Sequence, residues 1–185
     1  MWRPPRLSTR RSEQQRHDRI FCLPDLIPCA NLSLDYRATT EMHDMTTSRE
    51  FHCDKLVRFQ HCDPAGIVFY PQYFVLFHEV IEDWFNSGLK VDFARFVGTE
   101  GLGIPTVDIH AAFVAPSKHG ETLRFNLQVR EIGTSSITLY LTACAGAELR
   151  AKIDQTVVLF SVETRRPVPL PLDLKERMLR FSSRE

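Results

Sequence analysis

The sequence predicts an α+β domain, and two observations carry that prediction: one strongly amphipathic helix lies before the middle of the chain, and alternating strands follow it. A helix followed by a run of antiparallel strands buries its apolar side against the sheet, which is the α+β arrangement. The length of 185 residues, with 43% hydrophobic and 25% charged residues, suits one globular domain with a real core.

Residues 1–48 are expected to be a low-order extension, and residues 49–185 to be the folded domain. Residues 1–19 carry six Arg and two Pro without helical or strand periodicity, which is typical of a solvated tail. An organellar transit peptide is the alternative, but such peptides are poor in acids and this segment contains Glu13 and Asp18. From position 49 onward, apolar residues recur in strand-like stretches.

A long helix is predicted over residues 71–88. Its apolar residues recur with the spacing i, i+3, i+4, i+7, which places them on one side of a helix. These residues are Tyr73, Phe74, Phe77, Val80, Ile81, Trp84 and Phe85. Pro71 suits the first helical position, and Gly88 suits the residue just past the end.

The remainder of the chain is predicted to be mainly strand. Apolar and polar residues alternate over 123–130 and 137–143, and residues 133–135 suit a hairpin between them. Further strands are expected at 104–115 and 149–162, with a short helix at 173–181. Because such a sheet leaves unpaired edges that a second copy commonly covers, we expect at least a homodimer.

Charge and cysteine content limit which binding partners and which cellular compartment are expected. The 23 basic and 23 acidic residues cancel, so no overall field favours nucleic acid or an anionic membrane surface. The longest apolar runs fall far short of the roughly 18 residues that span a bilayer. Five Cys without a C-x-x-C pair argue against a disulfide framework. We therefore expect a cytoplasmic protein that binds neither nucleic acid nor membrane.

The segment HCDPAGIVFYP, residues 61–71, joins the first strand to the helix and carries the chemistry. Asp63 precedes a rigid Pro, and Gly66 lets the backbone approach another group closely. The helix starts without a capping Ser, Thr, Asp or Asn, so its first N–H groups are free to meet an oxyanion. A carboxylate beside such donors is what acyl transfer from a thioester requires. Alternatively, Asp63 is a turn residue that bonds nearby backbone N–H groups.

The longer segment HCDPAGIVFYPQYF resembles the signature of the 4-hydroxybenzoyl-CoA thioesterase family of hotdog-fold acyl-CoA thioesterases, and the resemblance covers residues 51 to about 178. It implies a hotdog fold, in which an antiparallel β-sheet wraps a long central helix. It also implies that Asp63 is the catalytic carboxylate and that the backbone N–H of Tyr70 polarises the thioester carbonyl. Subunits of this family pair to form the active site and often pair again, so a homodimer or homotetramer is expected.

Several residues are candidates for holding the substrate. Gly66 and His61 flank Asp63, while His78 and Glu79 lie on the helix, where an ordinary solvated face is the alternative. Some relatives hold CoA phosphates with basic residues in a turn that here reads EIGTSS, so other cations are needed. The candidates for that role are Arg130, Lys118, Arg165 and Arg166. Phe93, Phe96 and Phe113 are candidates for an acyl pocket, with core packing as the alternative.

No metal site is expected. The triplet His-Cys-Asp occurs at 52–54 and at 61–63, but zinc sites usually need a second ligand pair at short spacing, and nothing downstream supplies it. Cys62 is not expected to be a nucleophile, because the only basic residue at a suitable spacing is His61, whose side chain would point to the opposite side of a strand. No cofactor is expected either, since CoA is part of the substrate.

The sequence therefore predicts an enzyme, an acyl-CoA thioesterase that hydrolyses a thioester to a carboxylic acid and CoA. The acyl group is expected to be aromatic, as in 4-hydroxybenzoyl-CoA, or short. Asp63 serves as nucleophile or as general base, and the sequence leaves both open. Two alternatives are a hotdog dehydratase or hydratase acting on acyl thioesters, and a non-catalytic acyl-CoA-binding subunit.

Overall fold

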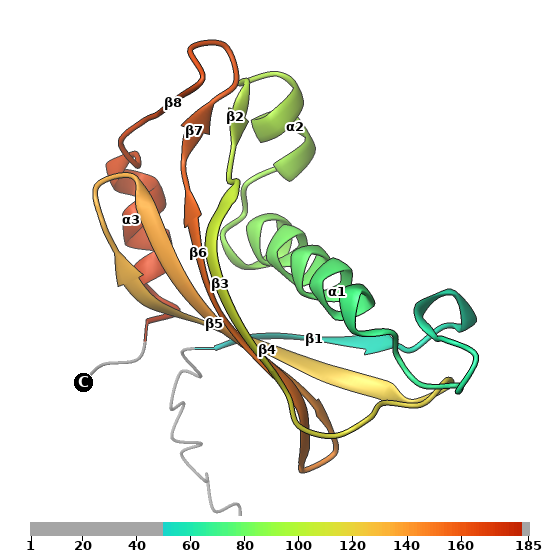
Figure 1. Cartoon of the computed structure of the whole chain (residues 1–185). Coiled ribbons are helices and arrows are strands. Elements are labelled where there is room, and N and C mark those ends of the chain that lie inside the picture. The colour runs from blue at the N-terminus through green and yellow to red at the C-terminus, as the bar shows by residue number, and fades with distance from the viewer. Residues whose placement is uncertain (1–49, 183–185) are drawn as a thin grey trace, which may run out of the picture. The chain divides into compact units, whose positions relative to one another are not determined.

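The computed structural model describes residues 50–182; residues 1–49 and 183–185 lie outside that range. The expected low-order extension, residues 1–48, falls outside it, so its order stays a prediction. Within the described part of the chain, a five-stranded antiparallel sheet, a long helix and two shorter α-helices make up most of the fold (Figure 1).

The main sheet has the strand order β1-β4-β5-β6-β3, and all neighbours are antiparallel. Its strands are β1 (Phe51–Leu56), β3 (Thr106–Phe113), β4 (Thr122–Ile132), β5 (Ser136–Ala145) and β6 (Glu148–Val158). Short strands β2 (Leu102–Gly103), β7 (Phe160–Ser161) and β8 (Arg166–Pro167) form a second sheet in the order β2-β7-β8. The strand predicted at 149–162 is thus two strands, because the chain leaves the main sheet after β6 to pair with β2 and β8.

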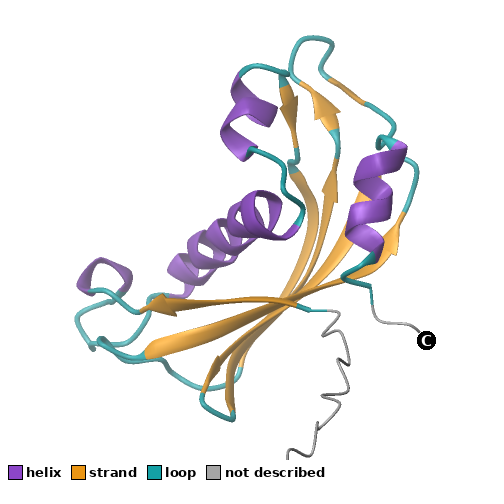
Figure 2. Cartoon of the chain, turned by 180° about the vertical axis from the view of Figure 1, so that it is seen from behind, coloured by secondary structure: helices purple, strands orange, loops and turns teal. Residues whose placement is uncertain are grey.

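The long helix α1 (Tyr70–Asp83) crosses the concave face of the main sheet (Figure 1 and Figure 2). Alternate residues of β4 and β5 point toward it and are buried, as a period of two requires. Phe77 of α1 meets Phe125 of β4 edge to face, with ring centroids 5.3 Å apart. This helix wrapped by an antiparallel sheet is the hotdog arrangement that the resemblance implies.

The end of α1 differs from the prediction that Gly88 follows the helix. Residues Trp84–Gly88 form one widened π turn, in which the N–H of Leu89 bonds the carbonyl of Trp84 at 2.8 Å. A Cβ atom on Gly88 would lie 2.7 Å from Cδ1 of the buried Trp84 indole. Glycine is therefore needed inside this turn because the indole fills the space a side chain would take.

Two shorter α-helices flank α1 and the sheet. Helix α2 (Phe93–Gly98), which the sequence pattern did not predict, is capped by Asp92, whose carboxylate accepts from the N–H of Arg95 at 2.9 Å. The rings of Phe93 and Phe96 pack against the ring of Phe85, with centroid distances of 5.3 and 5.4 Å. In this structure both side chains therefore contribute to core packing. Helix α3 spans Leu172–Leu179, close to the predicted 173–181.

Strand β3 forms an edge of the main sheet. It pairs with β6 and, among residues 50–182, with no strand on its other side. All eight of its residues are exposed, including the apolar Val107, Ile109 and Phe113. Tyr70 and Val75 of α1 are also exposed, and Tyr70 contacts Phe113 with ring centroids 6.0 Å apart. An apolar surface therefore runs from the β3 edge onto α1.

Candidate active site

Asp63 opens a tight four-residue turn between β1 and α1. Its carbonyl accepts the N–H of Gly66 at 2.9 Å, and its Oδ1 accepts the N–H of Ala65 at 2.8 Å. Asp at the first position, Pro64 at the second and Gly66 at the fourth are the residues that such a turn favours. Gly66 has φ of +76°, which glycine adopts readily. The turn holds the carboxylate in place through Oδ1 alone.

The turn is fastened at its base to the start of α1. The N–H of Asp63 bonds the carbonyl of Ile67 at 3.0 Å, and Cys62 pairs with Val68 in an antiparallel bridge. The N–H of Phe69 then bonds the carbonyl of His61 at 2.9 Å. The chain from 61 to 69 therefore doubles back on itself and delivers α1 beside the residues that precede Asp63.

The start of α1 is open. Phe69 occupies the capping position without a side-chain hydrogen bond, and no acidic residue lies in the first turn. Among residues 50–182, none accepts a hydrogen bond from the N–H of Tyr70. The positive end of the helix dipole and an unused donor thus face outward from the same backbone segment.

Asp63 lines a cavity of about 370 Å³. The carboxylate is half-buried, and its Oδ2 has no hydrogen-bond partner within residues 50–182. Gly66, which the sequence predicts to contact substrate, also lines the cavity. Its lining residues are Phe59, Cys62, Asp63, Pro64, Gly66 and His119. One carboxylate oxygen is therefore available to a molecule in this cavity.

His61 shapes this loop and does not line the cavity. Its side chain is 5% exposed, and Nδ1 accepts the N–H of Arg58 at 3.1 Å. Burial lowers the pKa of His61, although the charge of Glu79 acts in the opposite direction. A neutral ring is needed for that hydrogen bond, because protonated Nδ1 has no lone pair to accept it. In this structure His61 therefore stabilises the loop and does not face the cavity.

Both helix candidates contact charged side chains. His78 is exposed, with Nε2 3.2 Å from the Glu82 carboxylate. Glu79 and Asp83, one turn apart, both bind the ammonium of Lys55 on β1, at 3.2 and 2.7 Å. Burial works to lower the pKa of Lys55, but its hydrogen bonds to these two carboxylates outweigh that and raise it. Neither helix residue lines the cavity that contains Asp63.

Cys62 lines the cavity and Cys53 lies on β1 beside Asp83, and both thiols favour the neutral form. Burial raises the pKa of Cys53 to about 11. Burial also raises the pKa of Cys62, helped by the charge of the adjacent Asp63. Because the thiolate is the nucleophilic form, these environments fit the expectation that Cys62 is not the nucleophile.

The candidate cations for CoA phosphates are scattered. Arg130 pairs with Asp154 at 2.8 Å and lies over the ring of Tyr140 at 4.1 Å. Arg165 and Arg166 lie at the β7–β8 turn, at the far end of the described domain from the β1–α1 connection (Figure 1). Lys118 alone lies beside the site, since it forms a β-bridge with Ile67.

Phe59 and His119 line the cavity, and the sequence pattern did not identify them. His119 lies in the connection between β3 and β4, whose Ser117 is buried against α1 and accepts a hydrogen bond from the Tyr73 hydroxyl at 2.7 Å. Arg150 of β6 binds the carbonyl of Pro116 in the same connection. The sequence His-Gly-Glu at 119–121 does not by itself predict a site, because only the tertiary fold brings His119 close to Asp63.

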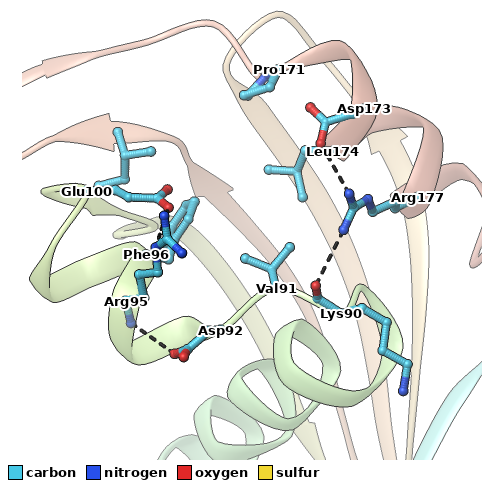
Figure 3. Close-up of a pocket in the computed structure, with 11 residues that line it drawn as sticks. Lys90, Val91, Asp92, Arg95, Phe96, Glu100, Pro171, Asp173, Leu174 and Arg177 are labelled. Atoms are coloured by element: carbon cyan, nitrogen blue, oxygen red, sulfur yellow. Dashed lines mark hydrogen bonds and ion pairs between the residues drawn. The ribbon is translucent and has the colours of Figure 1, made fainter.

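A second cavity of about 520 Å³ lies between α2 and α3 (Figure 3). Its two arginines are already paired: Arg95 with Glu100 at 3.4 Å, and Arg177 with Asp173 at 3.5 Å. Arg177 also donates to the carbonyl of Leu89 at 3.1 Å. Of the residues expected to hold or convert substrate, this cavity is lined only by Phe96, an acyl-pocket candidate whose ring packs against Phe85.

Residues 50–182 hold neither a cluster of metal ligands nor a membrane-spanning helix. No three His, Cys, Asp or Glu side chains in that range are grouped as metal ligands. No helix in the same range is long and apolar enough to cross a membrane.

The chain is similar in sequence to curated proteins of known activity. A 1,4-dihydroxy-2-naphthoyl-CoA hydrolase of Thermosynechococcus vestitus is 29% identical over 118 residues, covering 63% of this chain and 80% of the relative. The enzyme of the same name from Synechocystis sp. is 24% identical over 123 residues, covering 65% and 88%. The similarity extends over most of the length of both relatives.

Solved structures share the fold. The 1,4-dihydroxy-2-naphthoyl-CoA thioesterase from Synechocystis superposes with a TM-score of 0.62 at 22% identity, covering 70% of this chain and 96% of that one. A variant of 4-hydroxybenzoyl-CoA thioesterase complexed with 4-hydroxybenzoyl-CoA gives 0.64 at 22% identity, covering 70% and 99%. The sequence model of the thioesterase-like superfamily matches residues 57–178, well over half of the chain. This protein is a member of the thioesterase-like superfamily, with the hotdog fold.

Proposed function

We propose that the protein hydrolyses acyl-CoA thioesters to a carboxylic acid and CoA. The observation that carries the proposal is the Asp63 carboxylate. It lines a cavity just ahead of the uncapped start of α1, and one of its oxygens accepts no hydrogen bond from residues 50–182. The names of the curated relatives support the same reaction class. CoA enters as part of the substrate, and the reaction as proposed needs no further cofactor.

The proposed chemistry uses two groups. The N–H of Tyr70 donates to the thioester carbonyl oxygen, and the positive end of α1 stabilises the negative charge that develops there. Asp63 either attacks the carbonyl carbon, forming a mixed anhydride and expelling the CoA thiolate, or removes a proton from the attacking water. In the first route, water then cleaves the anhydride and regenerates the carboxylate. Gly66 keeps the turn open to the substrate.

The roles of the remaining candidates follow from their positions. Lys118 is the cation best placed to meet a CoA phosphate within the same subunit. Arg130, Arg165 and Arg166 would have to act on a substrate held by another subunit. His78 and Glu79 are exposed or half-buried on α1 and would likewise contact substrate only across a subunit interface.

The unpaired β3 edge supports assembly into a homodimer, with a homotetramer formed by pairing of dimers. Its eight exposed residues would continue the sheet into a second copy and cover the apolar surface shared with α1. The cytoplasm is the proposed compartment, and the free thiols of Cys53, Cys62 and Cys144 suit a reducing environment.

The test is a screen of the full chain against aromatic, short, branched and long acyl-CoAs, following free thiol release. Release with at least one acyl group is expected. Hydration of an enoyl-CoA without thiol release would replace the proposal with a hydratase, and calorimetric CoA binding without release would indicate a non-catalytic subunit. Single-turnover hydrolysis in heavy-oxygen water then separates the routes, because a nucleophilic Asp63 acquires the label before the product does.

A further inference from the structure

We propose that the imidazole of His119 gives a proton to the CoA thiolate as the thioester is cleaved, so that it acts as the general acid beside Asp63. The inference rests on the proposed thioesterase function and adds a second catalytic side chain to the same site. His119 lies in the connection between β3 and β4 and lines the cavity of about 370 Å³ together with Asp63. A carbon–sulfur bond breaks more readily when the departing sulfur receives a proton as it leaves.

Backbone contacts hold His119 against the turn that carries Asp63. The N–H of His119 bonds the carbonyl of Gly66 at 3.2 Å, and the preceding Lys118 forms an antiparallel bridge with Ile67. These two contacts fix the β3–β4 connection to the turn, so His119 and Asp63 line one cavity from two separate segments. Within residues 50–182 no ion pair joins the two side chains, so neither is occupied by the other.

The His119 ring is free to exchange a proton. In the described part of the chain it meets the Phe59 ring edge to face, with centroids 6.2 Å apart and an interplanar angle of 85°, and makes no hydrogen bond or ion pair. The side chain is exposed, so both ring nitrogens are accessible. In contrast, Nδ1 of His61 accepts the N–H of Arg58, and Nε2 of His78 lies 3.2 Å from a carboxylate.

No other side chain that lines the cavity within residues 50–182 suits this role. Asp63 is assigned to attack or to proton removal. The Cys62 thiol donates to the carbonyl of Arg58 at 3.6 Å, and burial raises the pKa of Cys62. The remaining lining residues, apart from His119, are Phe, Pro and Gly, which have no side-chain proton to exchange. Imidazole both donates and accepts protons near neutral pH.

The protons balance over one turnover. If Asp63 attacks the carbonyl carbon, the C–S bond breaks, its electron pair stays on sulfur, and the His119 proton converts the thiolate to CoA thiol. The neutral ring then accepts a proton from the water that cleaves the mixed anhydride, and both side chains return to their starting states. If Asp63 instead removes a proton from the attacking water, that proton passes from Asp63 to His119 after the thiol has formed.

The experiment varies the leaving group at a constant acyl group. The best acyl group from the screen is presented as its CoA thioester, its N-acetylcysteamine thioester and its thiophenyl ester. N-Acetylcysteamine is an alkyl thiol like CoA but lacks the nucleotide, whereas thiophenolate is a weaker base that leaves without a proton. His119→Gln should lower kcat/KM about 10²-fold on both alkyl thioesters, the lower end of what one general acid contributes. Its kcat/KM for the thiophenyl ester should stay close to the wild-type value.

Two further variants complete the comparison. His119→Ala opens space for added imidazole, which should restore part of the turnover of the CoA thioester. His52→Gln changes an exposed histidine on β1 that does not line the cavity, and it should match wild type on all three substrates.

Equal losses of His119→Gln on all three substrates would overturn the proposal, because a ring that only shapes the cavity affects every substrate alike. A loss limited to the CoA thioester would assign His119 to CoA binding and would also overturn it. Unchanged turnover by His119→Gln refutes the general acid and leaves the thioesterase proposal intact. If the wild-type chain releases no thiol from any of these substrates, the thioesterase proposal itself fails, and this inference fails with it.

Discussion

The hydroxyl of Tyr73 donates to Ser117 Oγ at 2.7 Å, in a contact buried from solvent. It joins the first turns of α1 to the connection between β3 and β4. The carbonyl of Ser117 also accepts the N–H of Val68, at 2.9 Å, just before the helix. These bonds hold the two halves of the candidate site together, since Asp63 lies on one segment and His119 on the other.

Breaking this contact should destabilise the fold. Tyr73→Phe leaves the buried Ser117 hydroxyl without its partner, and the expected loss is about 1–3 kcal/mol of unfolding free energy. Urea unfolding of Tyr73→Phe, Ser117→Ala and the double variant forms a cycle that isolates the coupling. Strictly additive losses would show that the hydrogen bond contributes nothing.

Lowering the pH should reduce the free energy of unfolding, because the buried His61 then takes up a proton. Its ordinary pKa is 6.5, and burial lowers the pKa in the folded state. The unfolded chain therefore binds more protons between that lowered value and 6.5. The stabilising contribution is complete above pH 6.5 and is lost as the pH falls through the lowered pKa.

Thermal unfolding of wild type and His61→Asn between pH 7.5 and pH 5 checks this. The Asn amide oxygen can still accept the N–H of Arg58, but it does not titrate, so the variant should lose less stability on acidification. Parallel pH profiles for the two proteins would exclude His61 as the source.

Arg150 should contribute more to stability than a typical surface arginine. Its side chain is 12% exposed and binds Glu121 at 3.2 Å as well as the carbonyl of Pro116. Arg150→Met should lower the unfolding free energy by roughly 2 kcal/mol, because charged hydrogen bonds are lost and their partners stay partly buried. Arg124→Met, which breaks an exposed pair with Asp54, is the control and should change stability little. A smaller effect at Arg150 than at Arg124 would contradict this interpretation.

Introducing charge on the β3 edge should dissociate the proposed dimer. Ile109→Lys places an ammonium on the exposed apolar surface of that strand, and sedimentation should show a smaller particle than wild type. Val162→Lys, at an exposed apolar position after β7, is the comparison variant and should leave the size unchanged. A monomeric wild-type chain would contradict the assembly itself.

Periodicity in the sequence predicts α1 and the strands because each buries one side against the other. The Asp63 turn and the open start of α1 are likewise visible in advance, since both lie in one continuous motif. His119 is not, because it reaches the cavity through a contact between segments some 44 positions apart, Tyr73 and Ser117. The π turn at Gly88 also depends on tertiary packing, since the buried indole of Trp84 decides it.

The claim that Asp63 is the catalytic carboxylate is tested most directly by kcat/KM of Asp63→Asn and Asp63→Ala on the best acyl-CoA substrate. With Asp63 as nucleophile or general base, both variants should lose about 10²–10⁴-fold while unfolding like wild type. Asp54→Asn removes an exposed carboxylate on β1 and should keep full activity. Full turnover by both Asp63 variants on every acyl-CoA tried would contradict the account.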